Sequence, residues 1–165
     1  MTEIGESSTD STRMPREAFM QELVDTVLPD TDNLEEKYPI FYPTTIDTDL
    51  GLQMKELILK DFDAWNNGYD AWAEWTKELY TEDASYDYRG TVYDKTTMQE
   101  GLKDLVESSK RVRLNNVLVS EDWAAIHFWN CTTDADGNKS ADNHMQFLHF
   151  VETEDGLKID LCFAK

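Results

Sequence analysis

The sequence predicts one α+β domain, because helical patterns come first in the chain and strand patterns follow. The chain has 165 residues, about the length of one domain with one core. Apolar residues recur every three or four positions between residues 52 and 79, as in amphipathic helices. From residue 112 onward, runs rich in β-branched and aromatic residues are separated by short polar turns. Helices followed by a meander of strands are the element order of an α+β fold.

The first 50 residues are predicted to form an N-terminal arm, and residues 51–165 the main domain. Residues 1–12 are polar and without periodicity, so we expect them to be mobile. A short helix is expected between Pro15 and Pro29. Its apolar face holds Phe19, Leu23, Val24 and Val27. Two prolines exclude regular helix from residues 38–43, and the three aromatic residues there need burial or a partner.

Three helices are expected in the main domain. The first covers residues 52–67 and the second residues 69–79, with an Asn-Asn-Gly stop signal between them. The apolar face of the first holds Met54, Ile58, Phe62 and Trp65, and that of the second Tyr69, Trp72, Trp75 and Leu79. The third opens with Thr97 and Glu100, which are spaced as a capping box.

Five strands are expected around and after the third helix. The first covers residues 84–90 and alternates so that Tyr86 and Tyr88 share one face. The other four cover residues 112–119, 123–133, 143–153 and 157–163, joined by turns that suit antiparallel hairpins. The 123–133 strand is apolar on both faces, so the sheet must be covered on both sides, either by the arm or by a second subunit. We expect a homodimer that forms through the outer sheet face.

The charge excludes a nucleic acid partner. The chain carries 34 acidic and 15 basic residues, for a net charge of −19, whereas a phosphate backbone requires clustered cations. We assign the densest cationic run, Lys110, Arg111 and Arg113, to the edge of a strand. Spacings typical of metal ligands and Gly-rich phosphate loops are both missing from the sequence, so we expect no metal and no cofactor.

The sequence also favours a cytoplasmic protein. It contains no uninterrupted run of about 18 apolar residues, so we expect no membrane span. The acidic first 20 residues do not resemble a secretory signal. Cys131 and Cys162 lie inside apolar strand patterns, which is typical of buried, unreactive thiols in a reducing compartment.

Residues 52–165 resemble the nuclear-transport-factor-two-like superfamily in the order of their elements. Ala-Trp-Asn-Asn-Gly at 64–68 is similar to the end of the first helix in SnoaL-like polyketide cyclases, and Tyr-Thr-Glu-Asp-Ala at 80–84 to the usual beginning of the first strand. A partial likeness to scytalone dehydratase rests on Tyr-Asp-Tyr-Arg at 86–89 and on two hairpins. The resemblance implies a cone-shaped, curled antiparallel sheet wrapped around three helices, with an extra N-terminal helical arm. It also implies a mostly apolar pocket lined by the concave face of the sheet.

Candidate catalytic residues follow from the same resemblance. Tyr88 takes the place of a catalytic tyrosine of scytalone dehydratase, and the register of the related families places His149 inside the pocket. We therefore expect both to be catalytic, with the phenol polarising a carbonyl oxygen and the imidazole moving a proton. Two other roles remain open, because tyrosines often belong to an aromatic core and a lone buried histidine is often only a hydrogen-bonded core residue. His127 is expected on the outer face, and His144 is expected to be solvated.

Further side chains are expected to bind substrate. They are Trp65, Asn66, Tyr86, Asn116, Asn130 and Phe147. Three of them depart from scytalone dehydratase: Asn66 replaces a catalytic aspartate, Asn116 a catalytic histidine and Phe147 a substrate-binding asparagine. Asn66 is equally suited to cap its helix.

These residues favour a cofactor-independent lyase or isomerase of dehydratase or cyclase type. Its substrate would be a small, partly apolar carbonyl or polyhydroxylated compound. The alternative is a non-catalytic module that binds a small ligand or dimerises, and the lost aspartate and histidine positions favour it. The fold itself does not decide, since it hosts enzymes and binding modules alike.

Overall fold

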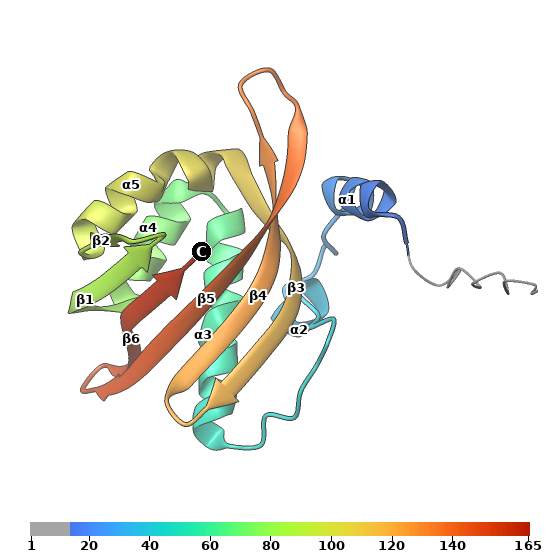
Figure 1. The fold of residues 1–165 in the computed structure, drawn as a ribbon. Helices are drawn as coiled ribbons and strands as arrows, with labels where there is room; N and C mark the ends of the chain where they lie inside the picture. The colour runs from blue at the N-terminus through green and yellow to red at the C-terminus, as the bar shows by residue number, and fades with distance from the viewer. Residues whose placement is uncertain (1–13) are drawn as a thin grey trace, which may run out of the picture.

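The computed structural model describes residues 14–165, and Figure 1 shows its elements. The helices are α1 (Arg16–Val24), α2 (Leu34–Lys37), α3 (Asp49–Asn66), α4 (Tyr69–Leu79) and α5 (Lys95–Ser108). The strands are β1 (Tyr80–Tyr88), β2 (Thr91–Tyr93), β3 (Ser109–Ser120), β4 (Trp123–Thr133), β5 (Lys139–Thr153) and β6 (Gly156–Ala164). None of the helices in this part of the chain is long and apolar enough to cross a bilayer. The mobility predicted for residues 1–12 lies outside the described residues.

The six strands form one open sheet in the order β2-β1-β6-β5-β4-β3, which confirms the α+β class. Figure 1 shows α3, α4 and α5 gathered on one side of it, which we call the inner face. Four strand pairs are antiparallel, but β1 and β6 run parallel. The sheet is therefore mixed, whereas the sequence analysis predicted a wholly antiparallel one. β1 is connected to β6 through β2, α5 and three further strands, a crossover long enough for parallel pairing.

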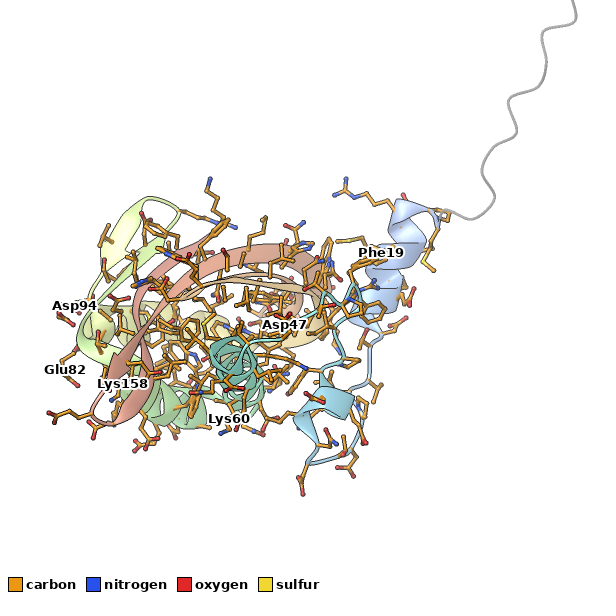
Figure 2. The ribbon with its side chains drawn as sticks, turned by 90° about the horizontal axis from the view of Figure 1, so that it is seen from below. Phe19, Asp47, Lys60, Glu82, Asp94 and Lys158 are labelled. Atoms are coloured by element: carbon orange, nitrogen blue, oxygen red, sulfur yellow. The ribbon has the colours of Figure 1, made fainter. Side chains whose placement is uncertain are left out.

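The core lies between the inner face and α3. The four residues predicted for the apolar face of the first main helix, Met54, Ile58, Phe62 and Trp65, are all buried. Burying each such side chain contributes about 1.5–3 kcal/mol. Figure 2 shows the sheet curving over α3, with side chains filling the space between them. The periodicity of α3 thus fixes which side of the sheet becomes the inner one.

Several element boundaries differ from the sequence prediction, and β1, β3 and β5 each begin three or four residues earlier than expected. α5 begins at Lys95, because Asp94 caps it and forms the capping box with Thr97, in place of the predicted Thr97 and Glu100 pair. α1 ends at Val24, which leaves Val27 89% exposed and off the predicted apolar face. The short elements α2 and β2, of four and three residues, were not predicted. Segments this short are too brief to show a hydrophobic periodicity.

The arm covers one end of the outer face and the exposed edge of β3. Phe19 of α1 packs edge-on against Trp129 of β4, with ring centroids 5.4 Å apart. Of the aromatic segment 38–43, Tyr38 is 3% exposed and buried in the core. The backbone N–H groups that follow, at Phe41 and Tyr42, donate to carbonyls of β3. An edge strand with unpaired backbone groups is thereby covered.

Candidate functional site

A narrow hollow lies between the inner face of the sheet, α3 and α5. Polar side chains meet in it from several elements, among them Tyr86, Tyr88, Arg111, Asn130 and His144. Its volume is about 20 Å³, which is room for one water-sized molecule. The open, mostly apolar pocket expected from the sequence is therefore almost filled, and a charged pair is part of what fills it.

Arg111 is the cation at the centre of this hollow. Its side chain is 3% exposed, and Nη1 donates to Asp61 Oδ2 of α3 over 2.7 Å. The guanidinium carbon lies 4.3–4.9 Å from three ring centroids, which belong to Phe62, Trp65 and Phe128. Within residues 14–165, Arg111 Nε and Asp61 Oδ1 have no hydrogen-bond partner. A buried guanidinium with an unused donor can bind an oxygen of a ligand.

The cationic run lies on an edge strand, as assigned from the sequence, but Arg111 does not share the exposure of its neighbour Lys110. Arg111 points inward from β3. The cation is stabilised inside by the carboxylate of Asp61 and by the aromatic rings around it.

Asn66 holds the backbone of Arg111 and does not line the hollow. Arg111 N–H donates to Asn66 Oδ1 over 2.8 Å, and Asn66 Nδ2 donates to the Arg111 carbonyl over 2.9 Å. The same Nδ2 also donates to the hydroxyl of Tyr38 over 3.2 Å. The amide thus replaces a missing neighbouring strand at the edge of β3. Its predicted role in substrate binding has no support in this geometry.

We expect Asn66→Leu to lower the free energy of unfolding by about 2 kcal/mol, because it leaves the Arg111 N–H and carbonyl without a partner. The shift of the urea midpoint measures this loss. Asn67→Ala is the matched control, since the Asn67 amide donates to the side chain of Asp63 in an exposed hydrogen bond, and we expect it to cost less than about 0.5 kcal/mol. Equal losses in both variants would contradict the strand-like role of Asn66.

His144 lines the hollow, whereas the sequence analysis predicted that it would be solvated. Its ring stacks on Phe128 with centroids 5.6 Å apart. Burial lowers the pKa of His144 below its ordinary value, and the charge of Arg111 lowers it further. The ring is therefore neutral at neutral pH and can accept a proton. The prediction failed because β5 starts at Lys139 and not at residue 143, so His144 stands well inside the strand.

Four of the predicted site residues meet in the hollow. Tyr86 is 6% exposed, and burial raises its pKa well above the ordinary value, so its phenol stays a donor. Tyr88 is partly exposed, with the guanidinium of Arg89 5.2 Å from its ring centroid. Asn130 is buried, and its Oδ1 has no partner among the described residues. Trp65 completes the group, with Nε1 donating to Ser109 Oγ over 3.2 Å. Their functional roles stay predictions.

The predicted catalytic histidine is on the other side of the sheet. His149 pairs with Trp123 and with Leu161, and its side chain contacts two carboxylates on the outer face. Inner and outer residues alternate along β5, and Leu148 is the buried inner one. A shift of one residue in the assumed register moves every side chain to the opposite face, which is why the placement of His149 inside is wrong.

Phe147 and Asn116 also lie on the outer face and do not reach the hollow. Phe147 stands two residues before His149 and is 48% exposed. Asn116 pairs with His127, which lies on the outer face as expected. The register of β3 shifts between Leu114 and Asn116, and alternation counted along the sequence does not reveal such a bulge.

Sequence reasoning missed the ion pair and Gln146, which is 8% exposed and also lines the hollow. One feature of the sequence did indicate the buried ion pair. Asp61 lies three residues after Ile58 and four before Trp65, so it shares the apolar face of its helix. A carboxylate on such a face needs a buried partner, which predicts an inward-pointing cation elsewhere. No group of three or more potential metal ligands occurs within the described residues.

A second hollow, of about 880 Å³, lies on the outer face of the sheet. Its floor is apolar: Met145, Phe147 and Phe163 are each between 42% and 48% exposed. Asp87 and Arg89, of opposite charge, also line it. Large apolar side chains in the middle of strands are unusual on a free surface and typical of a surface that binds a partner.

Comparison with known proteins supports the fold. No protein-family model matches the sequence, and no curated protein is similar to it at a significant level. Among solved structures, a protein from Jannaschia sp. CCS1 assigned as a SnoaL-like polyketide cyclase is 14% identical with a TM-score of 0.61, over 74% of this chain and 90% of that one. An NTF2-like protein from Anabaena variabilis is 14% identical with a TM-score of 0.58, over 74% and 94%.

A third solved structure has the same fold. It comes from Xanthomonas campestris, is assigned as a calcium/calmodulin dependent protein kinase II association domain, and is 15% identical with a TM-score of 0.58, over 77% of this chain and 94% of that one. Identities this low establish the fold and nothing more. The resemblance inferred from the sequence is confirmed at that level.

Proposed function

We propose that this NTF2-like cone binds a small, partly apolar carbonyl or polyhydroxylated compound in the inner hollow and moves a proton on it without a cofactor. The observation that carries the proposal is the convergence of three groups with different chemistry. Arg111 offers an unused donor, Tyr88 offers a phenol, and His144 offers a neutral imidazole. A proton acceptor and two oxyanion donors that line one narrow hollow are suited to proton abstraction next to a carbonyl.

The expected chemistry follows from these three side chains. His144 takes a proton from the carbon next to the carbonyl, and the electrons of that C–H bond form a C=C bond while the carbonyl oxygen becomes an oxyanion. Tyr88 and Arg111 donate hydrogen bonds to that oxygen. The proton then returns to another carbon in an isomerase, or to a departing hydroxyl in a dehydratase. His144 therefore replaces His149 as the proposed base.

Access to the hollow requires side chains to move, because about 20 Å³ admits no organic ligand. Tyr88 is the mobile candidate, since it is partly exposed and ends β1 at the turn that Arg89 and Gly90 make. Arg89 and Gly90 have φ angles of 52° and 87°, and the left-handed region is an uncommon conformation for an arginine. We expect the turn to change conformation when the ligand binds.

Deuterium exchange into a small ketone tests the proposed chemistry. With acetophenone in D₂O, NMR follows the loss of the methyl protons next to the carbonyl, and we expect the protein to accelerate it above the buffer rate. Tyr88→Phe should slow the accelerated exchange about 100-fold, as removal of one oxyanion donor does. His144→Gln should abolish it, whereas His127→Gln, on the outer face, should leave it unchanged. The rate should rise as pH increases through the lowered pKa of His144 and stay constant above it.

Two results would contradict the enzymatic proposal. One is exchange in Tyr88→Phe at the rate of the original protein. The other is an absence of any accelerated exchange together with an unchanged His144 imidazole signal when acetophenone is added. The second result would leave the cone as a structural element and would favour the alternative below.

A second candidate function is assembly, and the outer hollow favours it. Nothing within residues 14–165 covers its apolar floor, since α1 packs on the end of the sheet that holds Trp129. A second copy suits this surface because Asp87 and Arg89 both line it, so a two-fold axis can pair each with its opposite charge on the other copy. We propose a homodimer through this face. Solved structures of the fold are named both as a cyclase and as an association domain, so neither function is favoured by the fold alone.

A further inference from the structure

His149 lies between two carboxylates on the outer face. Its Nδ1 is 2.6 Å from Asp160 Oδ1 of β6, and its Nε2 is 3.0 Å from Asp122 Oδ2 in the turn between β3 and β4. The indole of Trp123 covers the ring, with centroids 4.8 Å apart. Both ring nitrogens therefore face acceptors, and only the doubly protonated imidazolium can donate to both.

This cluster borders the apolar floor of the outer hollow. His149 pairs with Trp123 on one side and with Leu161 on the other, and the next outer row along the strands joins Phe147 to Phe163. Cross-strand partners share a face, so the two rows are neighbours on one continuous surface. A second copy bound to the apolar row would also lie over or beside the histidine row.

The charge of the cluster depends on one proton. With the imidazolium present the three side chains carry a net charge of −1, and without it they carry −2. Asp122 and Asp160 are the charged groups that contact the ring, and Lys158 of β6 stands further along the same face, opposite Val151. In a two-fold dimer the cluster occurs twice, so loss of both protons adds two negative charges to an interface between chains that already carry −19 each.

We propose that His149, Asp122 and Asp160 form a proton-sensitive lock on the homodimer, which favours the dimer while the imidazolium is present and weakens it when the ring becomes neutral. This inference rests on the proposed homodimer. It assigns His149 a regulatory role on the outer face in place of the catalytic role expected from the sequence.

The sign of the pH dependence follows from the cluster. The hydrogen bond to Asp160 raises the pKa of His149 above its ordinary value, and the bond to Asp122 raises it further, although burial opposes them. The stabilising charge state is therefore fully present below the ordinary pKa of histidine and is lost as pH rises through the raised one. Suppose that dimer formation raises the pKa of each His149 by about one further unit. Deprotonation of both rings then raises the dimer dissociation constant about 100-fold.

Sedimentation velocity of the full chain at constant ionic strength tests the lock between about pH 6 and about pH 9, a range that spans histidine titration. We expect the dimer dissociation constant to rise with pH in the original protein. His149→Gln, which has no proton to lose, should give a weaker dimer at pH 6 and a constant that hardly varies with pH. His127→Gln is the matched control, since His127 lies on the same face beside Asn115, and it should keep the full pH dependence.

Two carboxylate variants test the mechanism separately. Asp160→Asn removes the largest cause of the raised pKa and should move the midpoint of dissociation to lower pH. The double variant Asp122→Asn with Asp160→Asn should stay dimeric at alkaline pH, because no uncompensated carboxylate remains in the cluster. Both aspartates are partly exposed, so these variants should fold as the original does.

The possible failures are distinguishable. A dissociation constant that is the same at pH 6 and pH 9 would overturn the lock and leave the homodimer intact. If the dissociation constant of His149→Gln still depends on pH, another group is responsible for the dependence, and the lock is overturned. A single chain at every pH and concentration would overturn the proposed homodimer itself, and the lock with it.

Discussion

Arg111→Met is expected to destabilise the fold by about 3–5 kcal/mol, a large fraction of the stability of a typical domain. The loss arises because Asp61, whose carboxylate accepts from Arg111 Nη1 over 2.7 Å, stays behind as an unpaired buried charge. The variant also loses the contacts between the guanidinium and three aromatic rings. Urea unfolding followed by tryptophan fluorescence measures the change.

The double variant Asp61→Leu with Arg111→Met separates the charge from the packing. Apolar residues of similar volume often replace a buried ion pair with no loss, or with a gain of about 1–4 kcal/mol. We therefore expect the double variant to be at least as stable as the original protein. A double variant as unstable as the single one would show that the aromatic cage needs the guanidinium itself and not merely a filled volume.

The same variants give evidence on function. The charge of Arg111 contributes to the lowered pKa of His144, so removing it should raise that pKa, which an NMR titration of the imidazole detects. If the pair is retained for function, a stable double variant will lose the deuterium exchange of acetophenone while keeping its fold. A double variant that keeps the exchange would exclude Arg111 as an oxyanion donor.

The long helices, and the succession of the long strands along the chain, were predictable because each depends on a local pattern. The face of α3 follows from Met54, Ile58 and Phe62, whose spacing of four residues has one helical interpretation. The mixed sheet was not predictable in the same way, since the parallel pairing of β1 with β6 joins residues that are 76 to 79 positions apart. Resemblance in element order indicated the cone but did not give its strand pairing.

The site was only half predictable, and the reason is the strand period of two. Alternation along β5 divides Gln146 and Leu148 from Phe147 and His149, but the pattern alone does not say which set faces inward. The wrong choice moved the histidine to the wrong side of the sheet. Arg111 and Asp61 lie 50 residues apart, and although Asp61 shares the apolar face of its helix, the sequence does not identify Arg111 as its partner. Only the packing of β3 against α3 makes them a buried pair.

Phe147→Asp is expected to abolish the homodimer while leaving the monomer folded. The side chain is 48% exposed in the single chain, so the substitution costs the monomer little. In the proposed dimer it would place an unpaired carboxylate in the apolar floor of the interface. A loss of about 2 kcal/mol at each of the two copies, as for a central interface residue, weakens the dissociation constant about a thousandfold.

Light scattering after size exclusion measures the mass directly, with twice 19.1 kDa expected for the original chain and 19.1 kDa for the variant. Leu52→Asp is the matched control, because Leu52 is 49% exposed but lies on α3, away from the outer face. If the control also dissociates, the cause is the added negative charge on an already acidic chain and not the contact at Phe147. If the control stays dimeric and only the Phe147 variant is monomeric, the uncovered apolar surface is the interface, and the neighbouring His149 cluster lies where a proton can regulate it.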